Sequence, residues 1–110
     1  MNEISYSRRC QTYTKALTYF GTSVQMIVAL EEFSEVSKEL CKILRGSGDM
    51  EHLAEEIADA TIMLEQLRYF LGLNEKVCKY MDLKIERLDD TLSKRGAYGN
   101  EEAAIDPENS

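Results

Sequence analysis

Two pairs of acidic side chains are the residues of this sequence that could do chemistry. Glu32 and Glu35 are three positions apart, and so are Glu56 and Asp59. In an α-helix this spacing places both carboxylates of a pair on one face. If the two helices are neighbours, four carboxylates converge, and they repel one another strongly unless a cation lies among them. Oxygen ligands of this kind suit a hard cation, Mg²⁺ or Mn²⁺, better than zinc or iron.

Four predicted helices must position these carboxylates. The single proline, Pro107, lies near the end of the chain, and glycines divide the preceding sequence into segments with helical spacing of apolar residues. Strict alternation and β-branched runs, which would indicate strands, are absent from the sequence. The expected helices are 4–20, one from a cap at Thr22 or Ser23 to about 45, 50–71 after an N-cap at Asp49, and 74–95. The fold class is therefore all-α, a four-helix bundle.

The second and third helices are expected to be antiparallel neighbours, because only residues 46–49 join them. On a helical wheel Glu32 and Glu56 each border an apolar stripe, and Glu35 and Asp59 lie just beyond them on the far flank. The stripe of the second helix consists of Ala29, Phe33, Val36, Leu40 and Ile43. The stripe of the third consists of Leu53, Ile57, Ala60, Leu64, Leu67 and Leu71. Both acidic pairs should therefore border the seam between the two helices.

Length and charge limit the classes of function. The 110 residues suffice for one small domain, which we place at 1–96, and the acidic, polar residues 97–110 are expected to form a disordered tail. A net charge of −7 argues against nucleic acid as a partner, and the sequence contains no apolar run of membrane-spanning length. The three cysteines fall within predicted helices, which indicates buried, reduced thiols in a cytoplasmic protein.

Neither acidic pair is specific by itself. The sequence has 20 aspartates and glutamates, so chance pairs at this spacing are expected. Two pairs on matching flanks of one seam are a more specific pattern. The second helix also carries a dense group of acids, relieved mainly by Lys38 and Lys42, although like charges destabilise a helix. This group is Glu31, Glu32, Glu35 and Glu39. Such a cost at one place invites a functional explanation.

Other catalytic chemistries fit the sequence less well. A di-iron centre in a helical bundle uses Glu-x-x-His pairs, and the single histidine, His52, forms none. His52 is expected in the first turn of the third helix, as a surface residue or at the edge of a substrate site. Cysteine or serine nucleophiles lack a partner base in the sequence.

The motif Glu-Glu-x-x-Glu, followed by Glu-x-x-Asp, resembles that of the MazG-like all-α nucleoside triphosphate pyrophosphohydrolases. The stretches that carry the resemblance are GTSVQMIVALEEFSEVSKELCKILRG and EHLAEEIADATIMLEQL, and it covers roughly residues 21–95. It implies an enzyme that uses Mg²⁺, with Mn²⁺ as the alternative, to hydrolyse a (deoxy)nucleoside triphosphate to monophosphate and pyrophosphate. It also implies a homodimer or homotetramer.

The resemblance assigns roles to individual residues. The metal ligands and catalytic residues that it implies are Glu32, Glu35, Glu56 and Asp59. Glu31 matches the leading glutamate of the motif and is expected beside the ligands. Gln25, two turns before Glu32, is either near the metal or the base, or is a capping or interface residue. Lys84 and Arg87 are candidate phosphate contacts by charge alone, with solvated surface positions as the alternative.

Two classes of function follow. The first is a pyrophosphohydrolase that cleans the nucleotide pool, which the presence of all four acids favours. The second is a non-catalytic oligomerisation or nucleotide-binding regulatory module of the same fold. A surplus of apolar residues on the first and third helices predicts a subunit interface in either case. The surplus consists of Tyr6, Tyr13, Leu17, Phe20, Ile62, Met63 and Tyr69.

Overall fold

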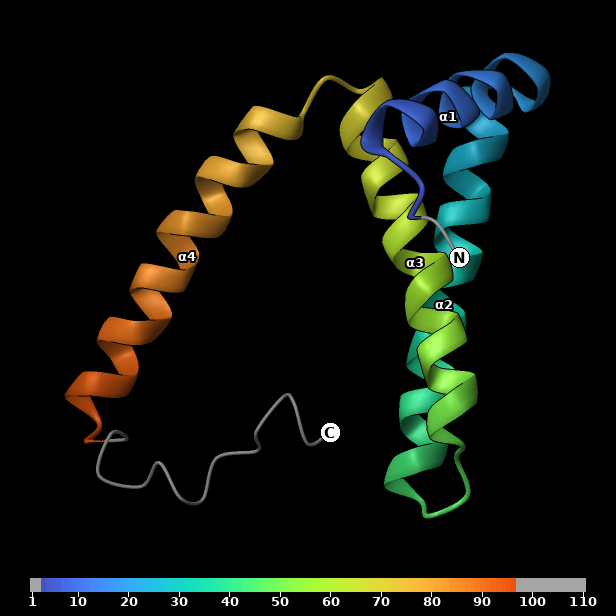
Figure 1. Cartoon of the computed structure of the whole chain (residues 1–110). Coiled ribbons are helices and arrows are strands. Elements are labelled where there is room, and N and C mark those ends of the chain that lie inside the picture. The colour runs from blue at the N-terminus through green and yellow to red at the C-terminus, as the bar shows by residue number, and fades with distance from the viewer. Residues whose placement is uncertain (1–2, 97–110) are drawn as a thin grey trace. The chain divides into compact units, whose positions relative to one another are not determined.

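The computed structural model describes residues 3–96, which form helices joined by short turns (Figure 1). The helices are α1 (Tyr6–Phe20), α2 (Thr22–Leu44), α3 (Met50–Phe70) and α4 (Asn74–Lys94). These residues include no strand, so the all-α prediction is confirmed. The chain divides into two compact units, of which the first ends at Asn74 and the second begins at Glu75. The predicted tail, 97–110, lies outside the described residues.

The first unit is built on the α2–α3 pair. The two helices run antiparallel and side by side, as predicted, and α1 crosses the end at which α2 begins and α3 ends (Figure 1). Gly21 alone separates α1 from α2, with φ at +90°, where a residue with a Cβ is strained. This residue allows the chain to turn a sharp corner and send α2 away from α1.

The helix starts were predicted with mixed success. The N-cap of α2 is Gly21, which makes no side-chain hydrogen bond, so the predicted cap at Thr22 or Ser23 is wrong. Gly21 occupies the N-cap position, so Thr22 and Ser23 already lie inside the helix and cannot cap it. Asp49 caps α3 as predicted: its Oδ1 accepts a hydrogen bond of 2.9 Å from the Glu51 backbone N–H.

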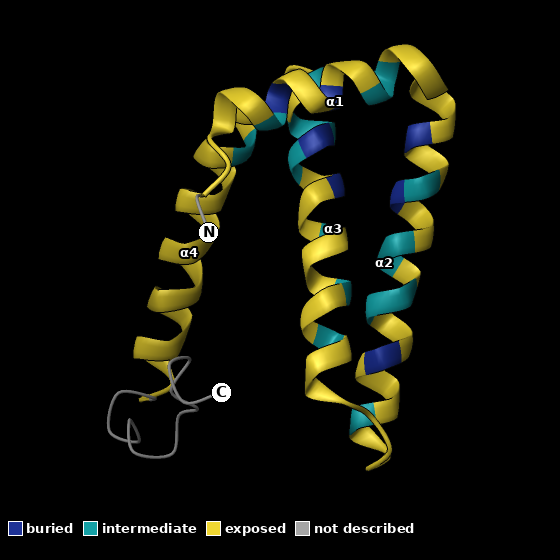
Figure 2. Ribbon diagram, turned by 45° about the vertical axis from the view of Figure 1, so that its right-hand side comes forward, coloured by how far each residue is buried: buried dark blue, intermediate teal, exposed yellow. Residues whose placement is uncertain are grey.

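The core of the first unit lies on the facing sides of α2 and α3 and under α1 (Figure 2). The buried apolar residues there are Cys10, Tyr13, Ala29 and Met63, and the buried polar residues are Gln25, Glu39 and Gln66. The predicted stripes are therefore partly wrong. Leu64 is 51% exposed, and Leu40, Ile57 and Leu71 are also exposed. Met63, predicted outside the seam, is only 6% exposed.

The faces that α2 and α3 bury are rotated away from the predicted apolar stripes, because hydrogen-bonded polar side chains occupy part of the contact between the two helices. Gln66 Nε2 on α3 donates a hydrogen bond of 2.6 Å to Gln25 Oε1 on α2. Among the described residues, no buried side-chain nitrogen or oxygen lacks a hydrogen-bond partner. A buried polar group costs little when it is hydrogen-bonded in this way. A wheel that places only apolar residues inside cannot identify such positions.

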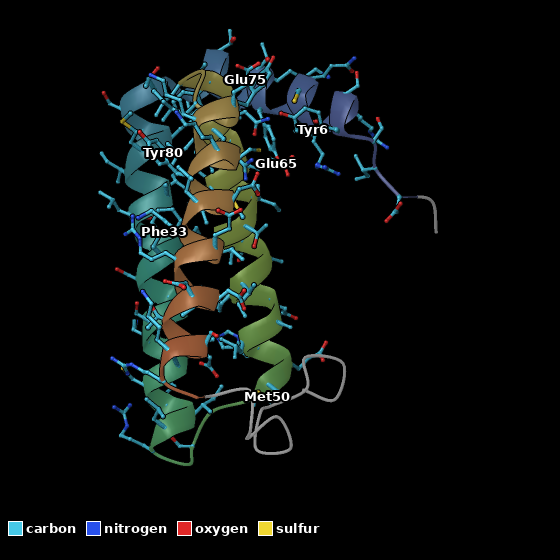
Figure 3. All side chains as sticks on the ribbon, turned by 90° about the vertical axis from the view of Figure 1, so that its left-hand side faces the viewer. Tyr6, Phe33, Met50, Glu65, Glu75 and Tyr80 are labelled. Atoms are coloured by element: carbon cyan, nitrogen blue, oxygen red, sulfur yellow. The ribbon has the colours of Figure 1, made fainter. Side chains whose placement is uncertain are left out.

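Polar contacts join α1 to α3. Glu65, labelled on α3 in Figure 3, uses Oε1 to accept hydrogen bonds from Arg9 Nε at 2.6 Å and from the Tyr13 hydroxyl at 3.0 Å. Burial, the hydrogen bond to Glu65 and the charge of Glu65 together raise the pKa of Tyr13 to about 12. The hydroxyls of Thr14 and Tyr69 form a further link of 3.1 Å.

The second unit contains α4. Its apolar residues Val77, Met81, Ile85, Leu88 and Leu92 recur at helical spacing, and none of the helix is buried. Among the three cysteines, which form no disulfide, Cys10 is buried, whereas Cys41 and Cys78 are exposed, contrary to the prediction of buried thiols. None of the helices described above is both long and apolar enough to cross a membrane.

The α2–α3 turn depends on a close approach at Gly48. A Cβ added there would lie 2.7 Å from the backbone nitrogen of Ile43 and 2.9 Å from its Cα. Backbone atoms cannot move aside as a flexible side chain can. The turn can therefore fold back onto the last turn of α2 only with glycine at this position.

We expect Gly48→Ala to lower the free energy of unfolding by about 1–3 kcal/mol, the usual cost of overpacking. This loss should outweigh the stabilisation that Gly→Ala otherwise gives by restricting the unfolded chain. Thermal unfolding followed by circular dichroism measures the change. Ser47→Ala is the control, because it removes only one exposed hydrogen bond of 3.3 Å. A Gly48→Ala protein as stable as Ser47→Ala would contradict the close approach.

Candidate metal centre

Three carboxylates meet across the α2–α3 seam. Glu32 comes from α2, and Glu56 and Asp59 come from the first three turns of α3. One carboxylate oxygen of each lies within 4.8 Å of those of the other two. Glu32 and Glu56 are half-buried and Asp59 is exposed, so the cluster borders solvent on the Asp59 side.

The crowding of negative charge is visible at Glu32. Burial raises the pKa of its carboxyl group, and the charges of Asp59 and Glu56, a hydrogen bond with Asp59 and the charge of Glu35 raise it further. A raised pKa means that the folded protein resists placing a full negative charge on Glu32. A proton relieves this repulsion in acid, and a metal ion would relieve it at neutral pH.

The donor set fits a hard divalent cation. All three groups offer carboxylate oxygen, which Mg²⁺ and Mn²⁺ prefer, and none offers sulfur or an imidazole nitrogen. Mg²⁺ binds oxygen at about 2.0–2.1 Å, so two of its ligand atoms lie at most about 4 Å apart. The oxygens of the cluster lie within 4.8 Å of one another, slightly more than this limit, so the three side chains would have to move closer together to bind one ion.

The fourth predicted ligand, Glu35, lies outside the cluster. Its side chain is 45% exposed, and its Oε1 lies 3.5 Å from Nζ of Lys38, three residues further along α2. The predicted position of Glu35 is on the outer flank of the α2 stripe. There its side chain is close to Lys38 and to solvent. Its charge nevertheless contributes to the raised pKa of Glu32.

The other residues predicted to bind cofactor or substrate lie on α2 and on α4. Glu31 is exposed on α2, whereas Gln25 is buried and bonded to Gln66, which corresponds to the interface position considered for it. Lys84 and Arg87 are exposed on α4, in the second unit. Their contact with a nucleotide stays a prediction.

Glu39 and His52 are neighbours of the cluster. His52 lies in the first turn of α3 with an exposed side chain, as predicted, whereas Glu39 was predicted only as one of a dense group of acids. Glu39 is only 3% exposed, and its Oε1 accepts a hydrogen bond of 3.0 Å from the Asp49 backbone N–H. His52 Nε2 lies 3.8 Å from Glu39 Oε2 and 3.2 Å from Glu56 Oε1. The side chain of Lys42 adds a weaker contact, 3.9 Å from Glu39 Oε2.

A seven-residue repeat of polar pairs could have indicated these neighbours. Gln25 faces Gln66, Glu32 faces Asp59, and Glu39 faces His52. Each step of seven forward along α2 meets a step of seven back along α3. Once Glu32 is matched with Asp59 in an antiparallel pair, the same register predicts the other two pairs.

Comparisons of this chain with protein-family models, with curated proteins and with solved structures found no match. The assignment of the carboxylate cluster therefore depends on its residue types, its geometry and its charge.

We expect Glu32→Gln to raise the melting temperature of the metal-free protein by a few degrees at pH 7. Folding raises the pKa of Glu32 above its ordinary value of 4.5. The contribution of Glu32 to stability is therefore complete below pH 4.5 and is lost as the pH rises through the pKa of the folded state. The variant avoids this loss, and at pH 4 the two proteins should converge. Thermal unfolding at both pH values measures the difference.

Glu55→Gln is the matched control for the change in net charge, because Glu55 is exposed on α3. A Glu32→Gln protein that is less stable than the wild type at pH 7 would show that the carboxylates do not repel one another as described.

Proposed function

We propose that this chain is a nucleoside triphosphate pyrophosphohydrolase that requires Mg²⁺, or Mn²⁺ in its place. It would convert a (deoxy)nucleoside triphosphate to the monophosphate and pyrophosphate, and so clean the nucleotide pool. One observation carries the proposal: carboxylate oxygens of Glu32, Glu56 and Asp59 lie within 4.8 Å of one another across two helices. The resemblance of the acidic motifs to MazG-like proteins supports the same activity.

The carboxylates would hold the cation, and the cation would hold the substrate. Both the triphosphate and the cluster are anionic, so neither binds the other without positive charge between them. A bound divalent cation would neutralise the phosphate oxygens and the charge that grows on the pyrophosphate leaving group. Glu32 and Glu56, which are half-buried, would fix the cation, and exposed Asp59 would face the substrate.

Glu35 would become the fourth metal ligand if its side chain rotated away from Lys38. An exposed ion pair such as Lys38–Glu35 contributes only about 0–1 kcal/mol, so it offers little resistance to rotation of the side chain. The Glu35 carboxylate would then join a cluster whose charge it already influences at Glu32.

The second candidate is a module of the same fold that binds nucleotide or a partner without turnover. The position of Glu35, beside Lys38 and outside the cluster, favours this candidate, because it leaves three ligands and not four. The enzyme is preferred because the sequence retains all four acids. We place either protein in the cytoplasm, where unpaired cysteines remain reduced, and we expect no nucleic-acid partner for a chain of charge −7.

Self-association of the chain is also part of the proposal. Of the surplus apolar residues predicted for an interface, Tyr13 and Met63 are buried and Leu17 is half-buried. The other four are exposed: Tyr6, Phe20, Ile62 and Tyr69. The α2 helix further exposes Val24, Ile27 and Leu30, which follow one another at intervals of three residues. Apolar surface of this kind is typical of subunit interfaces.

We expect the purified chain to release pyrophosphate from at least one member of a panel of dNTPs and NTPs with Mg²⁺, and none with EDTA. Glu35→Gln and Asp59→Asn should each lower the rate by roughly a hundredfold or more, because each removes a carboxylate that would hold the cation on which transition-state stabilisation depends. Their helical circular dichroism should be unchanged. Wild-type turnover that survives in both variants would exclude this site.

We expect a mass of at least two chains by light scattering at micromolar concentration, in keeping with a homodimer or homotetramer. Ile27→Glu and Leu30→Glu, each of which adds charge to the exposed face of α2, should shift the mass toward one chain. Thr22→Glu, at an exposed position on a different face of α2, is the control. A fully active monomer would contradict this part of the proposal.

A further inference from the structure

His52 contacts both Glu39 and Glu56. Neither His52 nor Glu39 belongs to the cluster of carboxylates proposed as metal ligands. Glu39 Oε1 is bound to the Asp49 backbone N–H at 3.0 Å, which joins α2 to the residue that caps α3. A carboxylate this deeply buried requires donors, and it is stable only where donors are fixed. Glu39 is therefore an anchor of defined position at the start of α3.

His52 connects this anchor to the metal centre. Its Nε2 lies 3.8 Å from Glu39 Oε2 and 3.2 Å from Glu56 Oε1, so the same edge of the imidazole ring faces both carboxylates. His52 and Glu56 are one turn apart on α3, and the Glu56 side chain is only 12% exposed. A carboxylate oxygen of Glu56 also lies within 4.8 Å of oxygens of Glu32 and Asp59, which repel it, so the contact with His52 restrains a side chain under repulsion.

We propose that His52, held by Glu39, is a positioning residue that fixes the carboxylate of Glu56 for cation binding. This inference rests on the proposed function, since it concerns the same carboxylates. Groups behind a metal ligand commonly orient it, and their removal lowers metal affinity by about 10–100-fold. The Glu39–His52–Glu56 series has this arrangement: a buried carboxylate, an imidazole and a ligand carboxylate in succession.

The test uses the full chain and Mn²⁺ as the probe, with the free ion measured by electron paramagnetic resonance. His52→Leu should weaken Mn²⁺ binding by about tenfold or more. His52→Gln should stay within about threefold of the wild type, because its amide nitrogen can donate a hydrogen bond to Glu56 in place of the 3.2 Å contact that Nε2 makes with it. Glu39→Gln, which keeps an acceptor for Asp49 but loses the charge opposite His52, should fall between them.

Glu55→Gln is the control for a general change in charge and should bind Mn²⁺ as the wild type does. A purely structural role for His52 would lower the melting temperature without changing the Mn²⁺ affinity. Equal or tighter Mn²⁺ binding by His52→Leu would overturn the proposal.

A second measurement is made without metal, so that failure of the proposed function can be recognised separately. Three-bond NMR couplings of Glu56 should report a single χ1 rotamer in the wild type and rotamer averaging in His52→Leu. Unchanged couplings would overturn the positioning role whether or not the protein binds a cation. The remaining outcome is that the couplings differ between the wild type and His52→Leu although the wild type neither binds Mn²⁺ nor releases pyrophosphate. That result would support the positioning of Glu56 and overturn the enzymatic proposal.

Discussion

The antiparallel register of α2 on α3 is the constraint on which the first unit depends. It places three polar pairs in the seam, seven residues apart on each helix: Gln25 with Gln66, Glu32 with Asp59, and Glu39 with His52. The Gln25–Gln66 and Glu39–His52 pairs are satisfied only if the other helix presents the partner at the same height. A slip of the register would leave buried polar groups without partners, which costs about 1–3 kcal/mol for each group.

The three polar pairs differ in what they contribute. The Gln25–Gln66 pair is neutral and buried, so its hydrogen bond specifies the alignment without adding charge. The Glu39 pair is anchored by the Asp49 N–H, which ties the alignment to the turn. The Glu32 pair is the one that carries unrelieved charge, as the raised pKa of Glu32 records. The outer two pairs therefore hold the central one in place against its own repulsion.

The parts of the structure that depend on local sequence could be predicted. Asp49 ends a glycine-containing turn and caps α3 through its own side chain, so the α2–α3 hairpin was readable from adjacent residues. The meeting of Glu32, Glu56 and Asp59 followed from spacing and from the shortness of that turn. The position of Glu35 did not follow, because it depends on which neighbour its side chain contacts, and Lys38 is closer than the cluster.

The inward positions of Gln66 and Glu39 depend on partners distant in sequence. An apolar wheel places Leu64 and Leu40 inside in their stead, yet both of these leucines are exposed. The faces that the two helices bury are decided by the contact of Gln66 with Gln25 and by that of Glu39 with the turn at Asp49. Neither contact exists until the helices have paired. Local sequence therefore predicts the helices better than the faces that they bury.

The seven-residue repeat of the polar pairs has a geometric consequence for the shape of the hairpin. An α-helix has about 3.6 residues per turn, so positions seven apart drift by about 20° along a straight helix. Keeping three successive layers in contact therefore favours a left-handed twist of α2 and α3 around each other, as in a short antiparallel coiled coil. Such a hairpin tolerates substitution between the layers far better than a change in length. One inserted residue would turn every later layer by about 100°, whereas a whole heptad inserted into each helix would preserve the order of the layers.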